Sequence, residues 1–253
     1  MCVSPKQHRN FMSVINLAGY KFVSLDALDD LKALLDRRCR ELELKGTVLL
    51  SFEGINVVLA GSRQATAEFQ ALTQADPRLA DLRFKRSLST YQPFDRMLIK
   101  IKKEIITLRA PGVDPAKERA PALAPAELKR WLDEGRDVVL LDTRNAFEVD
   151  AGTFDNAMDL RLSAFGQFAQ AADGLDPSLK DKTIVTFCTG GIRCEKAAPV
   201  LIGKGFRNVF QLDGGILQYF EECGDAHFKG RCFVFDQRVA LDGNLEPAVA
   251  NTP

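Results

Sequence analysis

Several classes of site and segment have little support in this sequence of 253 residues. It contains only 2 histidines and no C-x-x-C pair, so we expect neither a structural zinc site nor a two-histidine iron site, and we predict no metal. It has no Gly-x-Gly-x-x-Gly turn and no Gly-Lys-Ser/Thr loop, so no cofactor is identifiable. No apolar run approaches the ~18 residues that a membrane span needs. The polar start lacks an export signal, which predicts a cytoplasmic protein without a membrane partner.

Cysteine and charge are present but unevenly placed. The 6 cysteines are scattered, and in a reducing compartment we expect free thiols. The net charge is zero, yet residues 1–110 carry 18 Lys and Arg against 12 Asp and Glu. Most of that excess lies in residues 83–109, which hold 8 basic and 2 acidic side chains. This asymmetry predicts a polyanionic partner for the first part of the chain.

Proline marks the predicted domain boundary. Four prolines fall between Pro111 and Pro125, in a stretch rich in alanine and charge, which is typical of an exposed connector. We therefore predict a basic domain over residues 1–110, a linker over 111–122, a second domain over 123–235 and a tail over 236–253.

The pattern of apolar residues predicts an α+β domain followed by an α/β domain. The first part has strand and helix signals in the order β-α-β-β-α-β with a possible extra strand, which suggests a ferredoxin-like sandwich. Cys39 lies on the apolar stripe of the helix expected at 27–42 and is predicted to be core. In the second part, strands alternate with helices, which predicts a parallel sheet flanked by helices. The expected elements are strands at 13–18, 47–52, 55–60, 82–87, 97–108, 137–141, 183–187 and 208–212, and helices at 27–42, 65–72, 124–134, 163–172, 193–203 and 216–222.

The most informative segment reads F-C-T-G-G-I-R-C, from Phe187 to Cys194. It joins an apolar strand to a helix, so Cys188 would project into a loop at the helix start, where unpaired N–H groups favour an anion. We predict that Cys188 is a catalytic thiolate. The predicted active-site loop consists of Cys188, Thr189, Gly190, Gly191, Ile192, Arg193 and Cys194.

The length of this loop distinguishes two chemistries. Phosphatases that use a cysteine thiolate place five residues between Cys and Arg, whereas four lie between Cys188 and Arg193. The tighter ring resembles that of rhodaneses, which surrounds the extra sulfur of a persulfide. A buried structural cysteine before a Gly-Gly turn is the alternative.

The residues near Cys188 are candidates for supporting roles, and Arg193 and Cys194 have two interpretations each. Arg193 would stabilise the sulfur or a bound anion, or pin the loop to an acidic neighbour. Cys194 would be a resolving thiol for an oxidised Cys188, or a small residue packed inward. Asp142 and Arg144 end a strand beside the loop and are expected to form an orienting ion pair, while Glu148 is a candidate acid or base.

The basic segment is the candidate RNA-binding surface. Strand alternation predicts Ile99 and Ile101 on one face and Lys100 and Lys102 on the other, with aromatic residues nearby. This combination suits RNA, and a solvated sheet face is the alternative. The predicted RNA-binding residues are Arg83, Lys85, Arg86, Lys100, Lys102 and Lys103.

Three ordered motifs resemble the rhodanese superfamily: L-D-T-R-N-A-F-E from Leu141, the Cys188 loop, and Q-L-D-G-G-I from Gln211. Together with S-F-E-G-I-N from Ser51 and G-R-C-F-V-F-D-Q-R-V from Gly230, they are similar to the bacterial oxygen-dependent tRNA uridine hydroxylases. The resemblance implies an acylphosphatase-like or ferredoxin-like front domain joined to a rhodanese domain. It also implies an essential Cys188, the tRNA anticodon loop as partner, molecular oxygen as co-substrate, and hydroxylation at C5 of the wobble uridine.

The chain departs from the family pattern in three places. Thr153 stands where many rhodaneses have histidine, Pro199 lies inside the expected post-loop helix, and longer relatives continue into a cysteine-rich tail. The proline would cost ~3 kcal/mol unless the helix kinks.

Three functions remain open from the sequence. In a tRNA uridine hydroxylase, the thiolate would add to C6 of uridine or carry the oxygen itself. In a sulfurtransferase, Cys188 would carry a persulfide taken from thiosulfate or a protein thiol. The third is a non-enzymatic RNA-binding protein.

Overall fold

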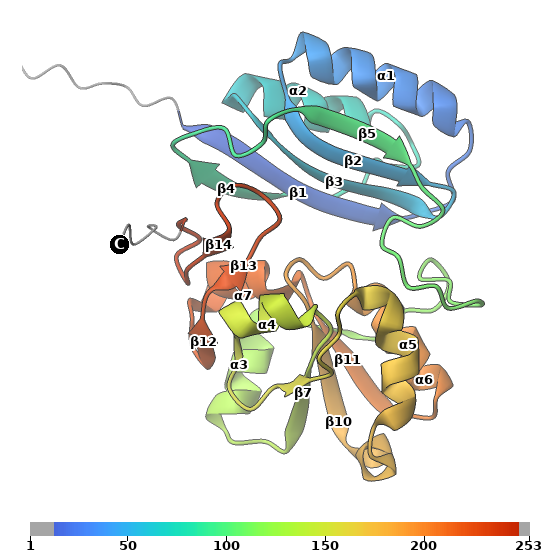
Figure 1. Ribbon diagram of the computed structural model, residues 1–253, viewed down its shortest axis with the longest axis vertical. Coiled ribbons are helices and arrows are strands. Elements are labelled where there is room, and N and C mark those ends of the chain that lie inside the picture. The colour runs from blue at the N-terminus through green and yellow to red at the C-terminus, as the bar shows by residue number, and fades with distance from the viewer. Residues whose placement is uncertain (1–12, 248–253) are drawn as a thin grey trace, which may run out of the picture.

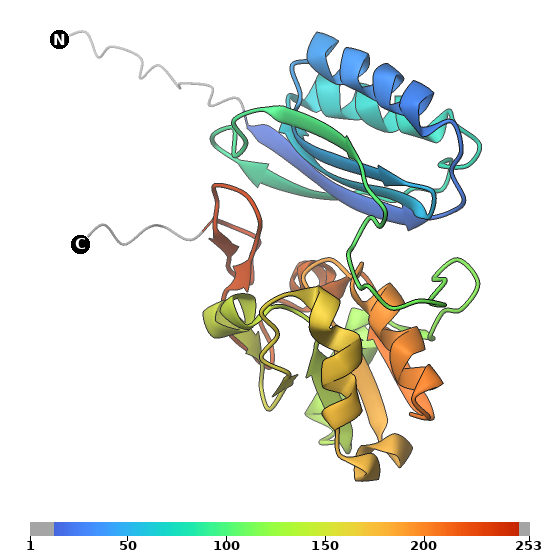
Figure 2. The same ribbon diagram turned by 45° about the vertical axis from the view of Figure 1, so that its right-hand side comes forward.

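The computed structural model describes residues 13–247, which form two domains placed one above the other (Figure 1). The upper, front domain has two helices on the outer face of a sheet, and the opposite face of that sheet is turned toward the lower, back domain (Figures 1 and 2). Within residues 13–247, no helix is long and apolar enough to cross a membrane. The five cysteines of this range are free thiols, while Cys2 and His8 lie outside it.

The front domain confirms the predicted ferredoxin-like topology. Its strands lie in the order β4-β1-β3-β2-β5, and neighbours are antiparallel except for β2 and β5. The first four positions are those of a βαββαβ sandwich, and β5 is the extra strand at one edge. The elements are β1 (Val14–Phe22), α1 (Leu28–Glu41), β2 (Lys45–Ser51), β3 (Gly54–Gly61), α2 (Arg63–Gln74), β4 (Lys85–Ser89) and β5 (Met97–Ile101).

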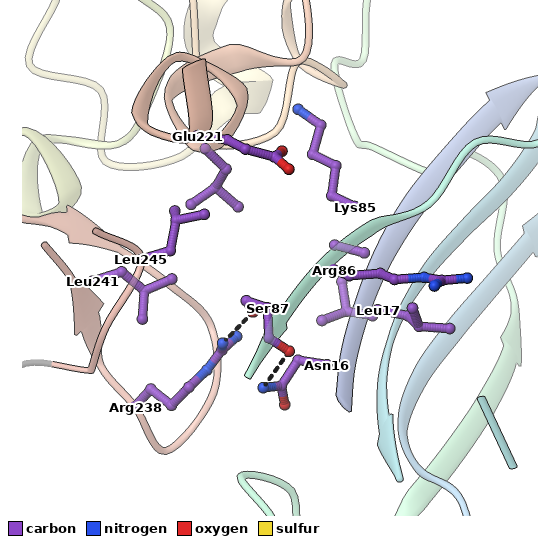
Figure 3. A pocket seen from close by; sticks show the side chains of 12 residues that line it. Asn16, Leu17, Lys85, Arg86, Ser87, Glu221, Arg238, Leu241 and Leu245 are labelled. Carbon is purple, nitrogen blue, oxygen red and sulfur yellow. Dashed lines mark hydrogen bonds between the residues drawn. The ribbon is translucent and has the colours of Figure 1, made fainter. Parts of the chain in front are cut away.

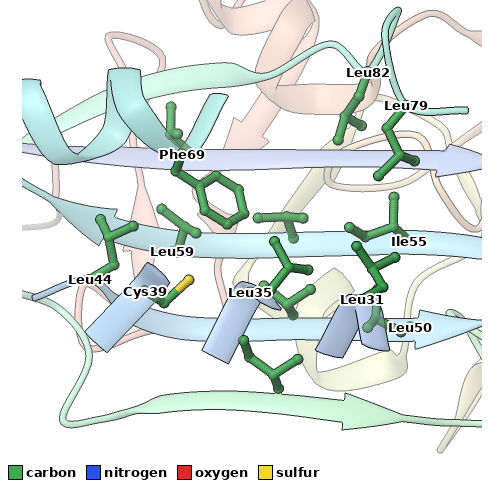
Figure 4. Close-up of a cluster of buried hydrophobic side chains, with 14 of the residues drawn as sticks. Leu31, Leu35, Cys39, Leu44, Leu50, Ile55, Leu59, Phe69, Leu79 and Leu82 are labelled. Atoms are coloured by element: carbon green, nitrogen blue, oxygen red, sulfur yellow. The ribbon is translucent and has the colours of Figure 1, made fainter. Parts of the chain in front are cut away.

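The front core lies between the sheet and its two helices (Figure 4). The helices contribute residues at helical spacing and the strands contribute alternate residues, so one face of each element is buried. Each large side chain removed from water stabilises the fold by roughly 1.5–3 kcal/mol. Cys39 is fully buried here, which confirms the predicted core role. Central members are Leu31, Leu35, Cys39, Leu50, Ile55, Leu59 and Phe69.

The back domain has a parallel sheet in the order β6-β11-β10-β7-β9, as predicted. Helices α3 and α7 pack on one face, and α5 and α6 on the other. β10 is central, so the loop that follows it lies in the middle of the carboxyl edge of the sheet. The elements are β6 (Ala122–Leu123), α3 (Pro125–Asp133), β7 (Val138–Asp142), α4 (Ala146–Ala151), β8 (Gly152–Phe154), β9 (Met158–Asp159), η1 (Phe165–Gln167), α5 (Phe168–Ala171), η2 (Ala172–Gly174), η3 (Pro177–Asp181), β10 (Thr183–Phe187), α6 (Cys194–Gly203), β11 (Asn208–Leu212), α7 (Gly215–Cys223), β12 (Phe228–Gly230), β13 (Cys232–Phe233) and β14 (Ala240–Leu241).

Two predicted elements are wrong in extent. The single helix expected at 163–172 is divided into η1, α5 and η2, with Gly166 in its first turn, where glycine disfavours helix. The strand expected at 97–108 ends at Ile101, because the chain then turns and the Glu104 carboxylate accepts hydrogen bonds from the N–H groups of Leu108 and Arg109. Ile99 and Ile101 occupy alternate positions of β5, as predicted, but Ile99 is buried whereas Ile101 is 37 % exposed at the end of this edge strand.

The segments flanking the back domain are more embedded than the sequence suggested. Leu108 lies within the predicted front domain, yet it packs in the core formed by α5 and α6. The predicted tail contributes β14, which pairs with β13. The Arg238 guanidinium in this tail donates to Ser87 Oγ of β4 at 2.7 Å, so the tail joins the two domains. Helix α6 continues through Pro199 to Gly203.

Candidate active site at the Cys188 loop

The backbone around Cys188 is held by the motif D-G-G-I, which joins the neighbouring strand β11 to α7. The N–H groups of Ile216 and Leu217 donate to the carbonyl oxygens of Cys188 and Thr189 at 2.9 and 3.0 Å. Gly215 has φ 67°, and a Cβ there would lie 2.3 Å from the Cys188 carbonyl oxygen. Only glycine accepts this backbone conformation and this approach. The start of α7 therefore supports the loop from below.

The loop closes around the Cys188 sulfur. The chain curls at Gly191, which has φ 98°, and the Gly191 N–H donates to Cys188 Sγ at 3.1 Å. The Cys194 N–H donates back to the Gly191 carbonyl at 3.0 Å, where α6 begins. Thr189 to Ile192 thus form a tight ring with the sulfur inside it.

The surroundings favour the thiolate form of Cys188. Burial acts to raise the pKa of Cys188, but it is outweighed by a hydrogen bond from the Cys194 thiol, the charge of Arg193, and the N–H groups of Arg193 and Gly191, so the pKa is lowered. Burial and the neighbouring Cys188 sulfur raise the pKa of Cys194 well above its ordinary value. The Thr143 hydroxyl lies 3.8 Å from the Cys194 sulfur.

Arg193 is bound to an acidic partner. Its two terminal nitrogens donate to the Glu148 carboxylate at 2.6 and 2.7 Å, and both side chains are buried. Glu148 also accepts from the Asn145 N–H at 3.1 Å as part of a capping box on α4. Since the Glu148 oxygens are committed to these bonds, the candidate acid or base role does not fit. The geometry favours the pinning role of Arg193, whose charge still lies close enough to stabilise the sulfur.

Asp142 and Arg144 form the ion pair that the sequence predicted. Arg144 Nη2 and Asp142 Oδ2 are 2.6 Å apart and neither side chain is exposed. Arg144 Nη2 also donates to the Gly152 carbonyl at 2.6 Å, and the Thr153 hydroxyl donates to Asp142 at 2.8 Å. Thr153, in the histidine position of many rhodaneses, therefore orients this pair. The pair braces the end of β7, and within residues 13–247 none of its hydrogen bonds goes to the Cys188 sulfur.

The front domain covers the loop, which the sequence did not reveal. The Tyr20 hydroxyl of β1 donates to Glu195 Oε1 at 3.2 Å, and a Cβ on Gly191 would lie 2.9 Å from that hydroxyl. Lys85 of β4 donates to the Gly214 carbonyl. Burial lowers the pKa of Lys85 to about 8, although the nearby Cys188 acts to raise it. Cys188 is 0 % exposed as a result of this packing and its own loop.

A buried cluster of charge also joins the domains. Lys196 Nζ of α6 donates to Glu53 at 2.9 Å, to Glu104 at 2.6 Å and to the Ile106 carbonyl at 3.0 Å. Lys196 is 2 % exposed, so its charge depends on these acceptors from the front domain and the segment after it. These bonds hold the front domain in a defined orientation over the cysteine loop of the back domain.

A separate small pocket lies between the open face of the front sheet and α7 (Figure 3). Lys85 of β4 and Glu221 of α7 lie on opposite sides of it, and Arg238 reaches Ser87 at its rim. Cys188 does not line this pocket. Within residues 13–247, no group of three or more His, Cys, Asp or Glu side chains is placed to hold a metal ion.

Comparison with known proteins assigns both domains. The UPF0176 acylphosphatase like domain matches residues 14–105, and the rhodanese-like domain matches residues 124–222. A tRNA uridine(34) hydroxylase of Burkholderia cenocepacia (strain HI2424) is 53 % identical over 245 residues, covering 93 % of this chain and 86 % of the relative. One of Cupriavidus pinatubonensis is 52 % identical over 242 residues, covering 94 % and 86 %. The chain belongs to the tRNA uridine(34) hydroxylase family.

Two solved structures match less than half of this family member. A rhodanese-like domain from Anabaena sp. matches with a TM-score of 0.36 and 22 % identity, covering 44 % of this chain and 79 % of that one. A human single domain sulfurtransferase matches with a TM-score of 0.34 and 23 % identity, covering 41 % and 97 %.

The structure separates the predicted RNA-binding residues of this family member into two groups. Arg83, Lys85 and Arg86 lie at or before β4, and the other three lie at or after β5, which is the opposite edge of the sheet. Lys85 differs from the other five, because alternation along β4 turns it toward the back domain, where it donates to the Gly214 carbonyl. The exposed members are Arg83, Arg86, Lys100, Lys102 and Lys103.

Tyr20 is the contact residue that sequence reasoning missed. Its hydroxyl meets Glu195 across 175 positions of the chain, so no local pattern around Tyr20 could reveal the contact. The Glu148 bond to Arg193 had a partial signal in the capping-box spacing of Asn145 and Glu148, which fixes the carboxylate at a helix start but does not name its partner.

Proposed function

We propose that this protein hydroxylates C5 of the wobble uridine of tRNA, with Cys188 as the reactive group. The observation that carries the proposal is the geometry around Cys188, where the Gly191 N–H donates to Sγ at 3.1 Å and the Arg193 charge acts to lower the pKa of the thiol. Relatives that are about half identical over nearly the whole chain carry the name tRNA uridine(34) hydroxylase. A member of that family with a stabilised thiolate has the nucleophile that this chemistry needs.

The proposed substrate contact is the anticodon loop. Lys100, Lys102 and Lys103 are exposed along the β5 edge and would neutralise phosphates of the RNA backbone. A base in an unpaired loop can leave its stack at a small cost, so the uridine can approach a side chain. The back domain would then supply the sulfur.

Molecular oxygen is the proposed co-substrate. One oxygen atom enters C5 in place of hydrogen, and the second leaves as water, which takes two electrons and two protons from an external reductant. The Cys188 thiolate would add to C6 and make C5 nucleophilic, or carry the oxygen atom to C5. In either route, the sulfur must return to the thiolate before the next turnover.

The closed packing adds a requirement to this proposal. Because Cys188 has no exposed surface, a uridine reaches it only when the contacts of Tyr20 with Glu195 and of Lys85 with Gly214 are released. Binding of RNA to the front domain would have to favour that open arrangement over the closed one.

The test is nucleoside analysis of tRNA from cells lacking this protein and the parallel hydroxylation routes. Wild-type protein should restore wobble-uridine hydroxylation, Cys188→Ser should not, and Cys223→Ser, which changes a partly exposed cysteine outside the loop, should act as wild type. Equal restoration by Cys188→Ser would remove Cys188 from the mechanism. No restoration by wild type would reject the function.

A sulfurtransferase is the second candidate, favoured by the four-residue ring between Cys188 and Arg193 and by the rhodanese-like match. The thiolate would attack thiosulfate, form a persulfide and release sulfite. Mass spectrometry after thiosulfate treatment should then find one added sulfur on Cys188, and an unmodified Cys188 would argue against this activity.

A further inference from the structure

Three phenylalanines form an exposed aromatic cluster beside the active-site loop. Phe147 comes from α4, and Phe233 and Phe235 come from β13 and the loop after it. The ring centroids of Phe147 lie 5.1 Å from Phe233 and 6.2 Å from Phe235, and those of Phe233 and Phe235 are 5.2 Å apart. Phe147 is 47 % exposed and Phe235 is 62 % exposed. Large apolar rings at this exposure, gathered in one place, are typical of a binding surface.

The cluster is adjacent to the chemistry. Phe147 immediately precedes Glu148, whose carboxylate binds Arg193 and accepts from the Thr189 hydroxyl at 3.4 Å. Consecutive residues of α4 therefore point to the cysteine loop and to the aromatic cluster. A ligand that reached Cys188 past α4 would lie against these rings.

The loop that carries Phe235 is fixed by a hydrogen bond across the loop and by two hydrogen bonds with the front domain. The Val234 N–H donates to the Val239 carbonyl at 2.9 Å across the loop. The Gln237 N–H donates to the Pro93 carbonyl of the front domain at 3.1 Å, and the Tyr91 hydroxyl donates to the Gln237 carbonyl at 3.2 Å. The rings thus form a preorganised surface, which loses little conformational entropy when a ligand binds.

We propose that the cluster of Phe147, Phe233 and Phe235 stacks unpaired bases that flank the target nucleotide of an RNA loop. This inference rests on the proposed function, since it takes the RNA substrate from there. Aromatic faces accept any base, and each stacked base contributes ~1–3 kcal/mol. The exposed lysines lie at the β5 edge, the opposite edge of the front sheet from β4, and would bind phosphates in another part of the same RNA.

A second copy of this chain fits the cluster less well. A stable homodimer buries roughly 1,200–2,000 Å² in total. The other large apolar side chain exposed on the same loop is Val239, at 58 %. The cluster therefore offers a small apolar site suited to a few rings.

The test compares binding of an anticodon stem-loop RNA to wild type, Phe147→Ala, Phe235→Ala and Ile202→Ala. Ile202 lies near the far end of α6 and is 47 % exposed, like Phe147, so it controls for loss of an exposed apolar side chain. Both phenylalanine variants should bind about 5- to 150-fold more weakly, which corresponds to the loss of one stacked base. Ile202→Ala should bind as wild type.

Two further readouts separate stacking from charge. The dependence of affinity on salt should keep its slope in the phenylalanine variants, whereas Lys100→Ala should lower that slope by about 0.7–0.9. A fluorescent adenine analogue beside the target uridine should be quenched on binding to wild type and less quenched by Phe235→Ala.

Unchanged affinity in both phenylalanine variants, or no RNA binding by wild type, would overturn the inference. So would a wild-type dimer in sedimentation that Phe235→Ala dissociates. Failure of the proposed function would give a different result. Wild type would then bind the RNA and quench the fluorescent adenine analogue, yet leave the uridine unhydroxylated.

Discussion

The buried pair of Arg193 and Glu148 gives the sharpest prediction, because it has two separable effects. The two terminal nitrogens of Arg193 donate to the two Glu148 carboxylate oxygens at 2.6 and 2.7 Å. Arg193 is 5 % exposed and Glu148 is fully buried. Replacing Arg193 by Met leaves a buried carboxylate without its partner beside an anionic sulfur. Loss of one member of such a pair costs about 3–5 kcal/mol, which lowers Tm by roughly 6–20 °C for a domain of this size.

The double variant Arg193→Met with Glu148→Met isolates the cause. Without either charge, the site becomes apolar at similar volume, and replacement of a complete buried pair is often neutral or stabilising. We therefore expect the double variant to regain most of the lost Tm. The pKa of Cys188 should nevertheless rise in both variants, since the charge of Arg193 is absent from each.

The measurements are thermal unfolding and the pH dependence of alkylation by a small uncharged reagent, with Cys188→Ser as background. The remaining cysteines of residues 13–247 have raised pKa values, those of Cys39 and Cys232 lying at about 12, so their reaction occurs at higher pH. A double variant as unstable as Arg193→Met would show that the orphaned carboxylate is not the cause. An unchanged alkylation midpoint would show that Arg193 does not stabilise the thiolate.

Three further predictions concern the cover, the loop and its titration. Tyr20→Phe removes a hydrogen bond of about 0.5–1.5 kcal/mol that helps to hold the two domains together. Alkylation of Cys188 at fixed pH should therefore be roughly 2- to 12-fold faster. An unchanged rate would mean that this bond does not limit access to Cys188. Gly215→Ala should destabilise the protein by more than ~1 kcal/mol and abolish hydroxylation, since Gly215 has φ 67° and the new Cβ would lie 2.3 Å from a carbonyl oxygen. The control Gly203→Ala places its Cβ in open space and should leave Tm equal or higher. Because the pKa of Cys188 is lowered in the fold, its thiolate adds stability that is complete above about pH 8.5, the unfolded value, and is lost as the pH falls through the folded pKa. Cys188→Ser should remove this part of the pH dependence of the unfolding free energy. If wild type and Cys188→Ser showed the same dependence on pH, Cys188 would not be a thiolate in the folded protein.

Much of the fold could be predicted because its elements have strong local patterns. The stripe that includes Leu31, Leu35 and Cys39 predicted α1, and the buried run before Cys188 predicted β10. The segment at 163–172 was mispredicted as one helix because its buried residues, Phe165 and Phe168, are three apart in short turns as well as in a helix.

The candidate site could be predicted only in part, because only some of its contacts join residues that are close in the sequence. The Cys188 loop is a local structure, since its strand, glycines and helix start are contiguous, and the ion pair of Asp142 and Arg144 spans two positions. Lys85 shows the limit of such local prediction. Alternation along a strand says that a side chain points to one face, but it does not say whether that face meets solvent or another domain.

The amino-acid sequence by itself determined the two domains' fold classes, the strand-to-helix loop and the position of Cys188 within it, because each depends on residues close together in the chain. Only the tertiary structure decided that the front sheet covers Cys188, that Glu148 takes both donors of Arg193, and that Phe147 meets Phe233 and Phe235. These contacts join residues far apart in sequence. Their partners are chosen by how whole elements pack, and no local pattern encodes that choice.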